Sequence, residues 1–155
     1  MNTREKTGIF TGTFDPFTIG HANIVKRGLP LFDHLVIGVA ESRLQNAHQS
    51  VADRVATIRS LYANEPRISV VSYNDLTADL VQREHASFLL RGVRSVADYE
   101  YERNQAEVNH QLCGVETILL FSEPSLASVS STLVRELEYF GKDVQEFLPT
   151  NKAEQ

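Results

Sequence analysis

Residues 8–21 of the chain read GIFTGTFDPFTIGH. An apolar run, Gly8 to Thr11, is followed by the turn-forming stretch Gly12 to Pro16 and then by a helical apolar pattern, His21 to Leu31. A strand that passes through a glycine-containing loop into a helix is typical of a parallel sheet wrapped by helices. Ligands of such sheets bind beyond the carboxyl ends of the strands. We therefore expect a binding site beside Gly12 to His21.

The same alternation continues along the rest of the chain. Further short apolar runs predict strands at Leu35 to Ala40, Ile68 to Tyr73, Phe88 to Leu90 and Thr117 to Phe121. Helical periodicity predicts helices at Ser50 to Tyr62, Thr77 to Glu84, Val96 to Leu112 and Ser130 to Phe140, with a short capping segment at Asp143 to Phe147. This order predicts an α/β fold, a doubly wound parallel five-stranded sheet flanked by helices.

Length and composition predict one compact domain. The 155 residues are 42% hydrophobic and show no repeat or linker, so residues 1–149 are expected to form a single domain and residues 150–155 a disordered tail. The 15 basic and 20 acidic side chains give a net charge of -5. That balance argues against nucleic acid or an anionic membrane as a partner.

The cellular location is also predicted from composition. Cys113 is the only cysteine, which excludes an internal disulfide and suits a reducing compartment. The longest apolar run, Leu35 to Ala40, is too short for a signal core or a membrane span. The simplest expectation is a cytoplasmic protein.

The loop and helix start in residues 12–21 carry residue types that suit phosphate chemistry. Gly12 and Gly20 remove side chains where the backbone turns, and Thr18 to His21 opens a helix whose free N–H groups attract anions. His21 and the Thr13 hydroxyl can donate hydrogen bonds to a phosphoryl group as its negative charge grows. Alternatively, residues 12–16 are a plain turn and His21 is bonded to nearby backbone.

Two further stretches are candidates for ligand contact. Arg91 and Arg94 follow the predicted fourth strand, and Gly92 between them would let the backbone approach a ligand. Guanidinium groups bind phosphate oxygens in bidentate fashion, although a surface arginine pair is the plainer explanation. Asp98 and Glu102 then lie four residues apart on one helix face, which is alternatively a solvated face. Near the C-terminus, the three hydroxyls of residues 130–132 form either a phosphate cradle or an ordinary serine cap.

These stretches resemble a known family. The combination GTFDP followed by T-x-G-H is similar to the nucleotidylyltransferase superfamily, which has a T/H-x-G-H signature. RGVRSVADYEYE (91–102) and VSSTLVRE (129–136) resemble bacterial phosphopantetheine adenylyltransferases, and the likeness extends from about Thr7 to Pro149.

The resemblance implies a fold, a reaction and roles for particular residues. It implies a Rossmann-like domain, usually assembled as a homohexamer, that transfers the adenylyl group of ATP to 4'-phosphopantetheine and releases pyrophosphate. Mg²⁺ would be bound mainly through the ATP phosphates, with no protein metal ligands. The residues implied in catalysis are Thr13, His21 and Arg94. Those implied in acceptor binding are Thr13, Gln45 and Arg91, and the position of Thr77 after the predicted third strand adds it to them. Those implied in ATP binding are Gly12, Thr13, Phe14, His21, Gly92, Arg94, Glu102, Ser130, Ser131 and Thr132.

The chain departs from the family after the predicted second strand. The family carries a lysine there that pairs with the phosphates of both substrates, and Gln45 occupies its position in an ungapped alignment. Residues 41–49 contain no lysine, so Arg43 and His48 are their only possible cations. Three functions therefore stay open: the adenylyltransferase, a relative that acts on another phosphorylated acceptor (a cytidylyltransferase or nicotinamide mononucleotide adenylyltransferase), and a weakly catalytic nucleotide or coenzyme A binding protein. For Thr77, the beginning of an ordinary helix explains the residue equally well.

Overall fold

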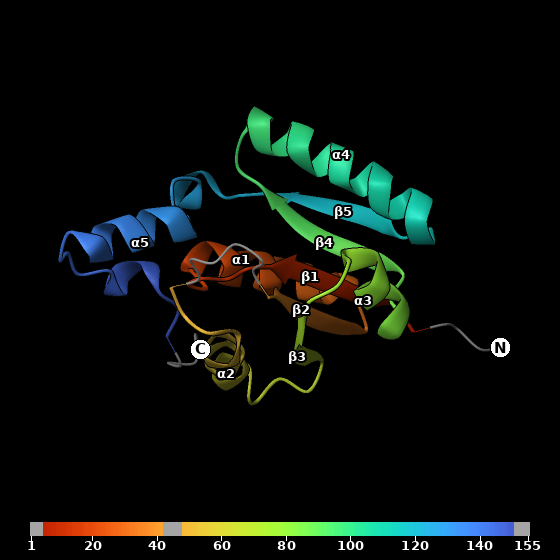
Figure 1. Cartoon of the computed structure of the whole chain (residues 1–155), viewed down its shortest axis with the longest axis horizontal. Coiled ribbons are helices and arrows are strands. Elements are labelled where there is room, and N and C mark those ends of the chain that lie inside the picture. Colours follow the sequence, from red (N-terminus) through yellow and green to blue (C-terminus); the bar gives the residue numbers. More distant parts are fainter. Residues whose placement is uncertain (1–4, 42–47, 151–155) are drawn as a thin grey trace.

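The computed structural model describes residues 5–41 and 48–150 as one α/β unit (Figure 1). Its strands are β1 (Thr7–Gly12), β2 (His34–Ala40), β3 (Ile68–Tyr73), β4 (Phe88–Val93) and β5 (Glu116–Phe121). Its α-helices are α1 (Ile19–Gly28), α2 (Val51–Leu61), α3 (Thr77–Arg83), α4 (Val96–Cys113) and α5 (Ser131–Tyr139). Short 3₁₀ turns cover Leu29–Leu31, Pro124–Leu126 and Gln145–Phe147. The predicted alternation of strands and helices is confirmed.

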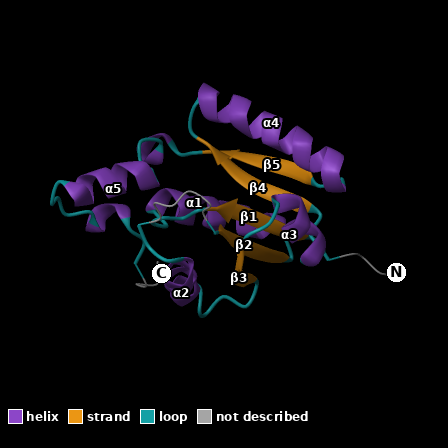
Figure 2. Cartoon of the chain, in the orientation of Figure 1, coloured by secondary structure: helices purple, strands orange, loops and turns teal. Residues whose placement is uncertain are grey.

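The sheet is parallel throughout, with the order β3-β2-β1-β4-β5 (Figure 2). The chain runs from β1 outward to β3 and then returns to the other side of β1 to add β4 and β5. The order therefore reverses between β1 and β4, which is the place where ligands bind to doubly wound sheets. The predicted fold class is confirmed.

Apolar cores cover both faces of the sheet. Successive residues of a strand point to opposite faces, so Phe10 joins one core and Ile9 the other. The first core contains residues of α1 and α2, such as Ile24 and Ile58, and the second contains Leu80 of α3. Because both faces are buried, β2 is a nearly continuous apolar run, from Leu35 to Ala40, rather than an alternating one.

Two helices are less enclosed than the others. Glu102 is the one buried residue of α4, whose exposed residues include the apolar Val108 and Leu112. Helix α5 lies beyond the carboxyl ends of the strands and so forms an outer wall of the region where β1 and β4 end (Figure 1). No helix in the described part of the chain is long and apolar enough to cross a membrane.

Strand β4 is longer than the sequence predicts. Its expected end is Leu90, but it continues through Arg91 and Gly92 to Val93 because its pairing with β5 continues, with Arg91 opposite Leu119. Its pairing with β1 stops at Leu90. Arg91 and Gly92 therefore belong to the strand itself, at the level where β1 and β4 separate.

Candidate active site

Two adjoining cavities open where β1 and β4 separate. The larger has a volume of about 370 Å³ and lies among the ends of β1 and β4 and the starts of α1 and α5. The smaller, of about 170 Å³, extends from the same place toward β2, α3 and α4. Both are lined by Thr11, Gly12, Thr13, Arg91, Tyr101 and Glu102. These shared residues place a ligand in one cavity next to a ligand in the other.

The start of α1 fixes the orientation of the His21 ring in the larger cavity. Thr18 caps the helix, with its hydroxyl oxygen 3.4 Å from the His21 N–H, while the Thr18 N–H donates to His21 Nδ1 at 2.9 Å. Since Nδ1 accepts a hydrogen bond, the proton of the neutral ring is on Nε2. Nε2 has no hydrogen-bond partner among residues 5–41 and 48–150. The sequence left two alternatives for His21, a hydrogen bond to nearby backbone or a donor to a ligand. The structure allows both, because Nδ1 bonds the backbone and Nε2–H remains for a ligand.

His21 is neutral at physiological pH. Burial, followed by the positive charges of Arg91 and Arg94, lowers its pKa from 6.5 to about 3. The rings of Phe14 and Phe17 surround it, with centroids 5.0 and 5.4 Å from that of the imidazole. A neutral Nε2–H can stabilise growing negative charge as a hydrogen-bond donor without transferring its proton.

The structure shows which group the missing side chain of Gly12 admits. A Cβ there would lie 2.8 Å from the ring of Phe14, so the glycine accommodates that ring where the backbone turns. Phe14 has a positive φ of 52° and is 3% exposed, packed against Phe10, Phe17 and His21. Both residues line the larger cavity, where Phe14 supports the histidine ring.

The guanidinium of Arg91 forms hydrogen bonds with Glu102 and Thr11 of the protein itself. Its Nε and Nη2 donate to the two carboxylate oxygens of Glu102 at 2.9 and 2.7 Å, and its Nη1 donates to the carbonyl and hydroxyl oxygens of Thr11. Burial would lower its pKa, yet the hydrogen bonds and charge of Glu102 raise that pKa above its ordinary value. The alternative of a solvated helix face is therefore excluded at Glu102, which is 6% exposed. Both carboxylate oxygens of Glu102 accept from Arg91.

Arg94 is the more available cation of the larger cavity. Its Nε lies 3.3 Å from Asp98, and its side chain is 41% exposed.

Gly92 between the arginines was expected to let the backbone approach a ligand. That expectation stays a prediction; a Cβ at Gly92 would also lie 3.1 Å from the side chain of Ile24, so the missing side chain makes room for α1. Gly92 still lines the larger cavity.

The three hydroxyls at the start of α5 are bonded within the protein. Ser130 caps the helix by accepting from the Leu133 N–H at 3.1 Å, and Ser131 donates to the Pro16 carbonyl at 2.7 Å. Thr132 accepts from Arg135 at 3.3 Å. The serine cap is present, and the residues still line the larger cavity. Their backbone N–H groups remain suited to an anion, because the first N–H groups of a helix have no partner within it.

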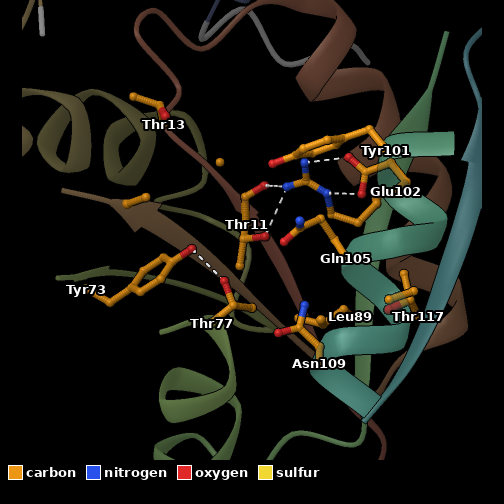
Figure 3. A pocket seen from close by; sticks show the side chains of 14 residues that line it. Thr11, Thr13, Tyr73, Thr77, Leu89, Tyr101, Glu102, Gln105, Asn109 and Thr117 are labelled. Carbon is orange, nitrogen blue, oxygen red and sulfur yellow. Dashed lines mark hydrogen bonds and ion pairs between the residues drawn. The ribbon is translucent and has the colours of Figure 1, made fainter. Parts of the chain in front are cut away.

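The smaller cavity contains polar residues that the sequence analysis did not identify. Tyr101, Gln105 and Asn109 of α4 line it at a spacing of four residues, and this spacing is the signal by which they could have been found (Figure 3). Thr77, predicted to bind acceptor, lies opposite them and has its hydroxyl 3.2 Å from that of Tyr73. These side chains give the cavity hydrogen-bonding groups along its length.

Two buried ionic residues beside the cavities were also missed. The carboxylate of Asp15 accepts from the N–H groups of His48 and Gln49 at 2.6 and 3.1 Å. Arg54 is 2% exposed and donates to the carbonyls of Thr13, Ala40 and Gln49 at 2.6, 3.0 and 3.1 Å. Asp15 lies within the GTFDP stretch and Arg54 in no motif, and the role of neither is visible in the sequence because their partners are backbone groups of other segments.

The loop that carries the departure from the family is only partly described. Gln45 and Arg43 lie outside the described residues, as does the expected tail from residue 151 onward. His48, at the end of the loop, contacts Glu138 of α5 at 3.1 Å. In the described part of the chain, no group of three or more His, Cys, Asp or Glu residues could hold a metal ion.

Comparison with known proteins agrees with this geometry. Residues 9–137 match the family model described as cytidylyltransferase-like. Phosphopantetheine adenylyltransferases of Bacteroides thetaiotaomicron and Phocaeicola vulgatus are 48% and 49% identical over 144 residues, which cover 93% of this chain and 95% of each relative.

A solved structure shows the same fold at low sequence identity. The bifunctional NMN adenylyltransferase/ADP ribose pyrophosphatase of Francisella tularensis superposes with a TM-score of 0.72 at 14% identity, covering 96% of this chain and 46% of that one. The cavities between β1 and β4, the T-x-G-H helix start and the near full-length relatives lead to one conclusion. The chain belongs to the phosphopantetheine adenylyltransferase family of cytidylyltransferase-like proteins.

Proposed function

We propose that the chain transfers the adenylyl group of ATP to 4'-phosphopantetheine, giving dephospho-coenzyme A and pyrophosphate. The observation that carries the proposal is the pair of cavities that meet at Thr11 to Thr13 and Arg91. The larger has the volume and the donors for a nucleotide. The smaller is lined by polar side chains that can form hydrogen bonds with an amide-containing chain, and the two phosphates would meet at the shared residues.

The chemistry needs positioning and charge stabilisation rather than a covalent intermediate. An oxygen of the acceptor phosphate attacks the α-phosphorus of ATP, a new P–O bond forms, and the bond to the bridging oxygen of the leaving pyrophosphate breaks. The acceptor phosphate is already anionic, so no base is required to activate it. His21 Nε2–H and Arg94 would donate to the α-phosphate as its charge grows, with Thr13 beside them.

Mg²⁺ is proposed to enter with ATP. Asp98 and Glu102, the carboxylates that line the larger cavity, contact Arg94 and Arg91 and are poorly placed to form a protein metal cage. This fits a cation that keeps several water ligands and binds through substrate phosphates. Bound in that way, Mg²⁺ would neutralise charge on the departing pyrophosphate.

We also propose that the chain forms a homo-oligomer, with the hexamer of the family as the expected state, and that it is a cytoplasmic protein. The exposed apolar side chains of α4, Val108 (48% exposed) and Leu112 (53%), support the oligomer. Size-exclusion chromatography with light scattering would measure the molar mass. We expect an oligomer for the wild type and a lower mass for Leu112→Glu, and a monomeric wild type would contradict the proposal.

The function is tested by pyrophosphate release with ATP or CTP and several phosphorylated acceptors, over a range of Mg²⁺ concentrations. ATP with 4'-phosphopantetheine should give the highest kcat/KM. A higher value with CTP or nicotinamide mononucleotide would favour a relative with another acceptor. The absence of lysine from residues 41–49 favours the binding-protein alternative, which would show ATP binding by calorimetry with no release from any acceptor.

A further inference from the structure

A buried guanidinium of α2 connects three segments at the site. Arg54 is 2% exposed, and its hydrogen-bond acceptors in the described part of the chain are main-chain carbonyls. Nη1 donates to Thr13 at 2.6 Å and to Ala40 at 3.0 Å, while Nε donates to Gln49 at 3.1 Å. Burying a charged group is unfavourable unless its hydrogen bonds are made, so the position of Arg54 depends on these carbonyls and theirs on Arg54.

The segments that Arg54 connects border both cavities. Thr13 follows β1 and lines the larger and the smaller cavity, and Ala40 ends β2 and lines the smaller one. Gln49 is fixed a second time, because its N–H and that of His48 donate to the buried carboxylate of Asp15. The main chain of the shared wall is thereby tied to the start of α2 from two directions.

We propose that Arg54 is a positioning residue for adenylyl transfer, acting through the main chain of Thr13. This inference rests on the proposed function, since it assigns Thr13 a place beside the reacting phosphates. The planar guanidinium offers donors in fixed directions to carbonyls that lie on different segments. An ammonium group keeps the charge but cannot reproduce that fork. Displacing a reacting group by about 1 Å is enough to lower a rate by about a hundredfold.

A matched control lies five residues farther along α2. Arg59 donates through Nε and Nη2 to a single carbonyl, that of Val70 in β3, at 3.2 and 2.8 Å. Neither Arg59 nor Val70 lines the cavities. Arg59→Lys therefore removes the same kind of contact from the same helix without touching the shared wall.

The test compares Arg54→Lys with Arg59→Lys in the full-length protein below its unfolding temperature. We expect Arg54→Lys to lower kcat by about tenfold to a hundredfold, with KM for ATP within about threefold of wild type. Arg59→Lys should keep the wild-type kcat. In a Thr13→Ala background, most of the Arg54→Lys effect should disappear, because the two residues act on the same group. A folded Arg54→Lys enzyme with wild-type kcat, or fully additive effects, would overturn the proposal.

Hydrogen exchange gives a readout that does not depend on turnover. The amides of residues 12–14 and 40–41 should exchange faster in Arg54→Lys than in Arg59→Lys, and equal exchange would contradict the positioning role. If the wild type releases no pyrophosphate, the proposed function fails. The exchange rates of these amides would still show whether Arg54 orders the shared wall.

If Arg54→Lys does not fold, Asp15→Asn is the variant to measure. It weakens the second attachment of Gln49 and should give a smaller loss of kcat with the same faster exchange.

Discussion

Two helices begin at the larger cavity, and their first turns use polar side chains differently. At α1, the Thr18 cap occupies Nδ1 of His21 and leaves its Nε2–H available to a ligand. At α5, the hydroxyls of Ser130, Ser131 and Thr132 are bonded within the protein. Both starts have a hydroxyl residue at the N-cap, Thr18 in α1 and Ser130 in α5. What separates a reactive group from a structural one is whether a donor remains after the cap is satisfied.

The largest effect should come from removing the available donor of α1. We expect His21→Ala to lower turnover by about a hundredfold to a thousandfold, because its hydrogen bond strengthens as charge develops on the α-phosphate. Steady-state kinetics combined with calorimetric ATP binding measures both quantities, and binding should change by less than about tenfold. Unchanged turnover would place His21 with the structural residues of α5.

The arginines at the end of β4 extend the same comparison. Arg91→Ala would leave Glu102 buried without its partner and should lower the free energy of unfolding by about 3 kcal/mol. Arg94→Ala should leave stability nearly unchanged, because its ion pair with Asp98 is exposed, and should raise KM for ATP by about tenfold. Denaturant unfolding and kinetics on both variants separate the roles. Equal losses of stability in the two variants would mean that Arg91 contributes no more to the fold than Arg94 does.

The lowered pKa of His21 predicts a dependence of stability on pH. Its pKa is about 3 in the folded protein and 6.5 when unfolded, so the unfolded chain gains a proton first as pH falls. The stability contribution is complete above about pH 6.5 and declines toward pH 3, by at most about 2 kcal/mol between pH 6.5 and 5. His21→Gln should flatten this part of the profile. Parallel curves for the variant and wild type would show an ordinary pKa.

The missing lysine concerns a donor whose position the described residues do not show. If no other residue supplies the charge, Gln45→Lys should raise turnover by about tenfold, a barrier change of about 1.4 kcal/mol. If Arg43 supplies it, Gln45→Lys should help little while Arg43→Ala is severely damaging. Kinetics of both single variants and of the double variant decide between these routes. Unaltered rates in both single variants would show that the charge comes from outside residues 41–49.

The fold could be predicted because its signal is local. Apolar runs bounded by turn residues identified all five strands, and Ile68–Tyr73 has the predicted bounds. The end of β4 was missed because Arg91 and Gly92 are poor strand residues by pattern. Their strand conformation comes from pairing with β5, which is a contact between distant segments.

The site could be predicted only where a motif is contiguous. The T-x-G-H stretch located the helix start, whereas the Arg91 and Glu102 pair joins residues 11 positions apart that fold alone brings together. Arg54 was out of reach for the same reason, since its partners are carbonyls at positions 13, 40 and 49. The side chains of α4 at positions 101, 105 and 109 were within reach, because their helical spacing is visible in the sequence.

The smallest effect on turnover should come from the hydroxyls of α5. Ser131→Ala removes the hydrogen bond to the Pro16 carbonyl, which we expect to lower the free energy of unfolding by about 1 kcal/mol and Tm by about 2–4 °C. Turnover and KM for ATP should stay within about threefold of wild type, because the backbone N–H groups of the first turn persist in alanine. Ser130→Ala, which removes the cap, should behave in the same way. A tenfold rise in KM for ATP in either variant, with normal stability, would instead show that these hydroxyls contact the nucleotide. The two helix starts would then both contribute side-chain donors to the ligand, and the distinction between them would lie in the charge that each stabilises.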